Sequence, residues 1–143
     1  MIDQKRNAEL HQAIELMYFA YRAFTKEPDK LLAKRGLNRV HHRILYFVAR
    51  NPGLSVNELL LTLEVSKQAL NQPMRQLIEM GLVKSTKAAY DGRVKLLSLS
   101  DKGMRLEKRL SDTQIDLLRT VFSETDSLSE ESWTRIMRLL AGA

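Results

Sequence analysis

Residues 55–75 read SVNELLLTLEVSKQALNQPMR, and their pattern is the most informative about the fold. Ser55 stands three residues before Glu58, which is the spacing of a capping box in which the serine caps a helix and the glutamate reaches back. Ser66 can cap a second helix. Only two residues separate the segments, so the stretch predicts two helices joined by a tight turn.

Two more helices are expected before this pair. Apolar residues recur at spacings of three and four from residue 7 to residue 24, as on one face of an amphipathic helix. The segment 25–30 contains Pro28 and is expected to end that helix. Asn38 can cap the next helix, whose apolar face reaches Val48.

A hairpin and two helices are expected after the pair. Residues 82–86 and 94–99 are predicted strands on either side of a polar turn. Ser100 can cap a long helix that ends near Phe122, and a last helix starts at about residues 127–130. The order predicts a mainly α protein with a small β hairpin (α+β), arranged as a winged helix-turn-helix.

The charge of the chain favours an anionic partner such as nucleic acid. Among its 143 residues, 23 Lys and Arg exceed 17 Asp and Glu, which gives a net charge of +6 with neutral histidines. The excess lies in the first two thirds, because residues 104–143 carry more acidic than basic side chains. The chain contains no cysteine, which excludes thiol chemistry and is consistent with a cytoplasmic protein. No apolar run is long enough to predict a membrane span.

The second helix of the pair has a polar outward face. Its members are Lys67, Gln68, Asn71, Gln72 and Arg75. Asn and Gln can form paired hydrogen bonds with adenine edges in the major groove, whereas Lys and Arg can hold phosphates. The free backbone amides beside Ser66 offer another phosphate contact. A solvated polar helix face is the alternative, and the hairpin that follows favours DNA binding.

The hairpin adds basic groups to the same half of the chain. These are Lys84, Lys87, Arg93 and Lys95. An arginine on a narrow tip suits the minor groove, whose negative potential attracts it. Asp91 lies two residues before Arg93 and can brace its guanidinium group. An ordinary charged hairpin is the alternative, since such surface pairs contribute little stability.

Pro73 interrupts the pattern of the second helix. A proline inside a helix removes one hydrogen bond and costs about 3 kcal/mol. Either the helix is kinked at Pro73, or it is short and Asn71 is its cap. Because Ala69 and Leu70 continue the apolar face, which we take to include Ile78, the kinked helix is favoured.

Five motifs in order resemble the MarR family of bacterial transcriptional regulators. Residues 37–45 resemble the start of the family's second helix, and residues 55–75 resemble its helix-turn-helix. Gly81-Leu82-Val83 and Asp91-Gly92-Arg93 resemble the helix exit and the Asp-x-Arg wing. Residues 99–103 resemble the start of the helix after the wing, so the resemblance spans about residues 37–106.

The resemblance implies a homodimeric transcriptional regulator, most often a repressor, that reads a near-palindromic double-stranded operator. Residues 37–103 would form the DNA-binding lobe, and residues 1–36 and 104–143 the dimerisation helices. The family also implies Arg93 in the minor groove and a crevice for a small aromatic or anionic effector that releases the DNA. The apolar stripes of the terminal helices independently need a partner surface, for which a symmetric dimer or a bundle within one chain are the alternatives.

Aromatic and basic side chains gather at the expected junction of the first two helices. The predicted ligand pocket consists of Tyr18, Tyr21, Arg22, Arg39, His41, His42 and Tyr46. Aromatic walls with an arginine, here Arg22, Arg39 or Arg43, suit an aromatic acid. Ordinary core and interface packing is the alternative for each residue.

Other functions lack a motif in this sequence. Adjacent histidines such as His41 and His42 point about 100° apart on a helix, so we expect no metal site there, and no cofactor. No Gly-rich phosphate loop or nucleophile motif is present, so we expect no enzyme. A DNA-binding regulator without a ligand switch and a winged-helix protein-interaction module are the alternatives, although exposed amides and arginines are untypical of a protein interface.

Overall fold

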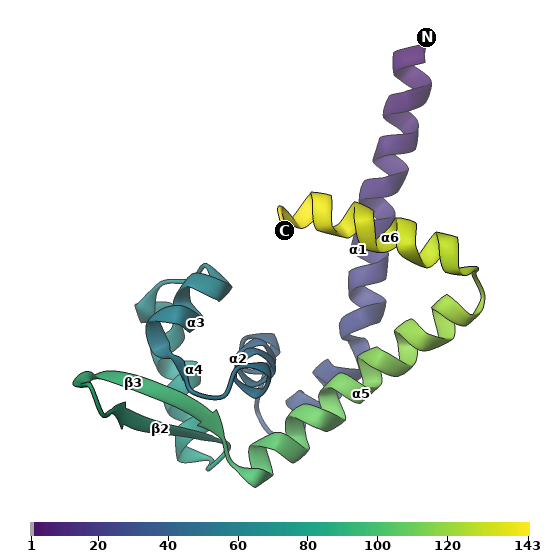
Figure 1. Ribbon diagram of the computed structural model, residues 1–143. Helices are drawn as coiled ribbons and strands as arrows, with labels where there is room; N and C mark the ends of the chain where they lie inside the picture. Colours follow the sequence, from purple (N-terminus) through teal and green to yellow (C-terminus); the bar gives the residue numbers. More distant parts are fainter. Residues whose placement is uncertain (1) are drawn as a thin grey trace.

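Six α-helices and three β-strands form the chain in the computed structural model, which describes residues 2–143 (Figure 1). The helices are α1 (Ile2–Ala33), α2 (Arg39–Arg50), α3 (Val56–Leu63), α4 (Lys67–Glu79), α5 (Asp101–Ser123) and α6 (Ser127–Ala141). The strands are β1 (Leu54–Ser55), β2 (Val83–Ala88) and β3 (Asp91–Leu99). The predicted mainly α fold with a small antiparallel sheet is confirmed.

The elements form two parts, a lobe that contains α2, α3, α4 and the sheet, and an arm that contains α1, α5 and α6 (Figure 1). Helices α2, α3 and α4 gather with the sheet, while α5 leads away from the end of β3 and packs along α1. The N-terminal half of α1 projects beyond the lobe, and α6 turns back after α5 (Figure 1). None of the helices over residues 2–143 is both long and apolar enough to cross a membrane.

Local capping explains where most helices begin. Asn38, Ser55, Ser66 and Ser100 accept backbone N–H groups in the first turns of α2, α3, α4 and α5 at 2.9–3.1 Å, as predicted. The reciprocal capping box was predicted at Ser55 and Glu58, but it occurs instead at α2, where the Asn38 N–H donates to Nδ1 of His41 at 3.0 Å. Asp126 caps α6.

The sheet has three antiparallel strands in the order β1-β3-β2. Val83 of β2 pairs with Leu99 of β3, and a register shift follows Lys87. The sequence predicted only the hairpin, because β1 has two residues and cannot show the alternation of a strand. β1 pairs Leu54 with Leu97 and so ties the start of α3 to the wing, which is the β2–β3 hairpin.

Buried apolar side chains from every part of the lobe form one core together with the end of α1 and the start of α5. They include Leu32, Ile44, Leu45, Leu59, Leu70, Leu77, Leu82, Leu97, Leu106 and Leu110. In α4 the buried face is Leu70, Met74 and Leu77. Ala69 and Ile78 were predicted to point inward but are exposed, because they flank this face. The buried face leaves the predicted reading side of α4 free.

Both helix-interior prolines are accommodated without ending their helices. The prediction that α1 ends at residues 25–30 is wrong, because α1 continues to Ala33. Pro28 cannot donate to the Phe24 carbonyl, and Gln114 of α5 donates to that carbonyl instead at 3.3 Å. α4 begins at Lys67 with Ser66 as its cap and continues through Pro73, so Asn71 is not the cap.

Candidate functional site

The reading side of α4 is exposed along two turns. Lys67, Gln68, Asn71, Gln72 and Arg75 all lie at the surface, and the opposite side of the helix packs into the core. The Ser66 hydroxyl accepts the Ala69 N–H at 3.1 Å, which fixes where the helix begins. The five predicted residues, three amide side chains and two cations, therefore share one accessible face.

Arg93 at the wing is held by Asp91. The carboxylate accepts the Arg93 backbone N–H at 2.9 Å, and it accepts Nε and Nη2 of the guanidinium at 3.2 Å each. These hydrogen bonds lower the pKa of Asp91 from its usual value, and those from the Arg93 side chain have the largest effect. The Arg93 side chain is nonetheless 91% exposed, so its remaining N–H donors face outward in a fixed orientation.

A groove of about 500 Å³ lies between α4 and the wing. From the predicted set it brings together Lys67, Asn71, Arg75, Arg93 and Lys95. The other predicted residues lie outside its lining, with Asp91 half-buried and the rest exposed, namely Ser66, Gln68, Gln72, Lys84 and Lys87. Sequence reasoning did not identify Asn57 and Ser85, which also line the groove and come from α3 and β2.

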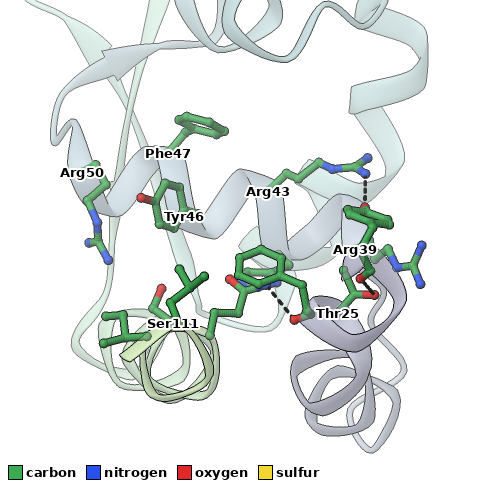
Figure 2. A pocket seen from close by; sticks show the side chains of 13 residues that line it. Thr25, Arg39, Arg43, Tyr46, Phe47, Arg50 and Ser111 are labelled. Atoms are coloured by element: carbon green, nitrogen blue, oxygen red, sulfur yellow. Dashed lines mark hydrogen bonds between the residues drawn. The ribbon is translucent and has the colours of Figure 1, made fainter. Parts of the chain in front are cut away.

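A second hollow of about 390 Å³ lies between α1, α2 and α5, and we call it the arm cavity (Figure 2). Its lining consists of Tyr21, Phe24, Thr25, Arg39, His42, Arg43, Tyr46, Phe47, Arg50, Ser111, Gln114, Ile115 and Leu118. Four members of the predicted pocket line it, namely Tyr21, Arg39, His42 and Tyr46, together with Arg43. The predicted clustering of aromatic and basic groups is therefore present in part.

Three predicted pocket residues do not line the arm cavity. Tyr18 and Arg22 lie on another side of α1, where the guanidinium of Arg22 stacks over the Phe19 ring at 5.0 Å. His41 points toward α4, because neighbouring helix positions face different directions. The wall contributed by α5 was missed, since residues such as Ser111 are distant in sequence and carry no pocket signal.

The three arginines of the arm cavity differ in their partners. Nε of Arg39 contacts Asp29 at 2.9 Å, and Nη2 of Arg50 contacts Glu107 at 2.8 Å. Nη2 of Arg43 donates to the Tyr21 hydroxyl at 3.1 Å, and no ion pair within residues 2–143 engages it. Arg43 is therefore the cation of this cavity whose charge has no acidic partner among the described residues.

Burial keeps His42 neutral beside these cations. Desolvation is the largest influence and lowers the pKa of His42 from its usual value of 6.5, and Glu107 and Asp29 oppose the shift. A neutral imidazole adds no positive charge to the cavity at pH 7. Within residues 2–143, no three His, Asp or Glu side chains are placed to hold a metal ion.

Sequence comparison matches the helix-turn-helix and the first part of the wing to a known family. The sequence model of the MarR family matches residues 35–94. The HTH-type transcriptional regulator PetP of Rhodobacter capsulatus is 43% identical over 114 residues, which cover 80% of this chain and 69% of PetP.

Solved structures share the fold at low sequence identity. The crystal structure of a MarR family transcription regulator superposes with a TM-score of 0.82 at 15% identity, covering 99% of this chain and 93% of that one. PcaV from Streptomyces coelicolor, solved with its natural ligand, gives a TM-score of 0.70 at 19% identity and coverages of 93% and 91%. A point mutant of S. aureus MepR bound to an oligodeoxyribonucleotide gives 0.64 at 16%, with coverages of 91% and 96%. With the family match and the PetP relationship, this likeness shows that the chain is a transcriptional regulator of the MarR family.

Proposed function

We propose that this regulator is a homodimeric repressor that binds double-stranded DNA sequence-specifically and is released by a small aromatic anion. The observation that carries the DNA-binding part is the juxtaposition of the polar face of α4 with the braced Arg93 across one groove. In this arrangement α4 enters the major groove and the wing enters the adjacent minor groove. The oligonucleotide complex of MepR, which shares this fold, supports DNA binding by this regulator.

The dimer is supported by apolar faces that nothing in one chain covers over residues 2–143. On α1, Leu10, Ile14 and Met17 recur at spacings of four and three, and Ile14 is 63% exposed. On α6, Ile136 is 60% exposed and Leu140 lies on the same face. Residues 37–103 would then bind DNA and residues 1–36 and 104–143 would bury these faces against a second copy. Two reading helices about 34–36 Å apart would match a near-palindromic operator.

The effector part of the proposal rests on the arm cavity. Arg43 is a cation without an acidic partner among the described residues, and the Tyr21 hydroxyl beside it adds a hydrogen-bonding group. Tyr46 and Phe47 supply aromatic walls (Figure 2). An aryl carboxylate would place its charge at Arg43 and its ring against these walls. The PcaV structure, which contains that protein's natural ligand, supports a ligand-binding role for this fold.

Salt titration with an operator obtained by binding-site selection tests the DNA interface. If Lys67, Arg75, Lys84 and Arg93 each neutralise one phosphate, two protomers neutralise about eight, and the log–log salt slope is about −7. Arg93→Ala is expected to weaken binding to most duplexes and to reduce the slope by about 2. Asn71→Ala or Gln68→Ala is expected to relax discrimination at a base pair by about 1–3 kcal/mol. Fluorescence anisotropy on selected and scrambled duplexes measures both.

Arg119→Ala provides the matched control, because Arg119 is an exposed arginine of α5 remote from both α4 and the wing. It should change neither the slope nor the discrimination. A flat salt dependence of the wild type, or equal losses on all duplexes for Arg93, Asn71 and Gln68 variants, would contradict the assignment of these residues.

Thermal unfolding with a panel of aryl carboxylates tests the effector site. A compound at 100 times its dissociation constant adds about 2.7 kcal/mol to the free energy of unfolding. For a chain of this size the melting temperature should rise by roughly 5–10 °C. Arg43→Met should abolish most of the rise, whereas Arg39→Met should reduce it less, because Arg39 is already paired with Asp29.

The outcomes separate two kinds of regulator. If no compound raises the melting temperature while the selected operator is bound tightly, the chain is a DNA-binding regulator without this ligand switch. If the rise persists in Arg43→Met, the anion binds elsewhere and the assignment of Arg43 is wrong.

A further inference from the structure

One buried hydrogen bond joins the reading helix to the helix that lines the arm cavity. Nε2 of His41 on α2 lies 2.9 Å from Oε1 of Gln76 on α4. His41 is 3% exposed, so water has little access to this contact. The Gln76 amide nitrogen also donates to the Gly36 carbonyl at 3.4 Å, in the turn that precedes α2.

The hydrogen-bonding pattern fixes the direction of this contact. The backbone N–H of Asn38 can only donate, so Nδ1 of His41 must accept it and the ring proton must lie on Nε2. Nε2 then donates to Oε1 of Gln76, which leaves the Gln76 amide nitrogen facing Gly36 as observed. Both ring nitrogens of His41 and both polar atoms of the Gln76 amide therefore have a matched partner.

Gln76 lies at the edge of the proposed reading face of α4, one turn after Gln72, and its side chain is directed toward α2. Arg75, its neighbour, is exposed toward the groove, while Leu77 on its other side is buried in the core. Apolar contacts such as those of Leu77 are non-directional and tolerate small rotations of a helix. A hydrogen bond between two buried or half-buried side chains does not tolerate such rotations, because its strength falls when donor and acceptor are misaligned.

The same histidine lies in the first turn of α2 and so connects the helix that lines the arm cavity to α4. His41 completes the capping box with Asn38, and the next residue, His42, lines the cavity. The hydrogen bond thus ties α4 to α2, the helix that carries Arg39, Arg43 and Arg50. No residue of this contact is among those proposed to touch DNA.

We propose that His41 is a positioning residue for DNA reading, which sets the rotation of α4 through its hydrogen bond to Gln76. The inference rests on the proposed DNA-binding function, and it adds a determinant of base discrimination that does not contact the DNA. Loss of the bond lets α4 rotate on its apolar face, so Gln68 and Asn71 meet base edges less accurately. Phosphate contacts, which are geometrically more tolerant, persist.

Gln76→Leu tests this directly, because it removes the contact but leaves the capping box of α2 intact. Affinity is measured for the selected operator and for a scrambled duplex, and their ratio reports base discrimination. We expect the ratio to fall roughly tenfold, since a buried hydrogen bond contributes about that factor, while the affinity for the scrambled duplex stays within about twofold. His41→Gln should largely preserve the ratio, because glutamine suits this capping position and offers both an acceptor and a donor.

The double variant His41→Leu/Gln76→Leu separates positioning from stability. Replacing both partners by apolar groups removes Nε2 of His41 and Oε1 of Gln76 together, while the Asn38 N–H loses its acceptor, so the melting temperature should stay within a few degrees of that of Gln76→Leu. The discrimination ratio should remain as low as in Gln76→Leu and fall no further. An unchanged ratio in Gln76→Leu, or losses that multiply in the double variant, would overturn the proposal. A wild-type protein that selects no operator would instead overturn the proposed function.

Discussion

Gly103→Ala is expected to lower the free energy of unfolding by about 3 kcal/mol or more. A Cβ atom at this position in the first turn of α5 would overlap the Leu82 carbonyl oxygen and lie 3.0 Å from its carbonyl carbon. Both atoms belong to the backbone, so no side-chain rotation relieves the overlap. The same carbonyl accepts the Ser100 N–H at 3.0 Å, and the Leu82 side chain is fully buried. Denaturant unfolding followed by circular dichroism measures the loss.

Gly92→Ala is the matched control for this substitution. Its added Cβ would meet nothing closer than Cδ of Lys87 at 4.0 Å, an ordinary contact with a flexible side chain. We expect its unfolding free energy to stay within about 0.5 kcal/mol of the wild type. A Gly103→Ala protein as stable as Gly92→Ala would show that α5 does not approach the start of β2 this closely.

The start of α5 illustrates what the sequence made predictable. The Ser100 cap was identified from a local pattern, since Ser100 accepts an N–H only three residues away. The brace between Asp91 and Arg93 also spans two residues and was identified in the same way. The role of Gly103 was not, because the atom that excludes a side chain there belongs to Leu82, which lies far from it in the sequence, just before β2.

The elements that sequence reasoning missed depend on partners far along the chain. Pro28 was expected to end α1, but the carbonyl that it frees is satisfied by Gln114, 90 residues after Phe24. β1 exists because two residues pair with β3, a partner that no local periodicity reveals. The arm cavity was half predicted for the same reason: the wall from α2 follows helix spacing, whereas the wall from α5 depends on tertiary packing.

His41 shows how a correct residue can receive the wrong role. The sequence placed it with His42 in the ligand pocket because both are near the same aromatic and basic side chains. Helix geometry separates them, so His42 lines the arm cavity and His41 faces Gln76. The sequence contains no sign of this bond, because its two residues are 35 positions apart.

Arg50→Met is expected to lower the free energy of unfolding by about 3 kcal/mol, at the lower end of the range for breaking a buried ion pair. Glu107 is 2% exposed, and its carboxylate accepts Nη2 of Arg50 at 2.8 Å and the Ser111 hydroxyl at 2.5 Å. Methionine keeps much of the apolar stem of the arginine, so the substitution chiefly removes the charge that compensates Glu107. The lower end applies because the Arg50 side chain is 44% exposed and water can partly replace it.

Two further variants identify the buried charge as the cause. Arg39→Met removes an arginine whose pair with Asp29 is more exposed, so it should cost at most about 1 kcal/mol. Arg50→Met/Glu107→Met removes both charges and should regain much of the stability that Arg50→Met loses, because no uncompensated carboxylate remains in the junction between α2 and α5. If the double variant is less stable than Arg50→Met by the full cost of a second core substitution, the loss comes from packing. The ion pair would then not be what holds the lobe against the arm beside the cavity.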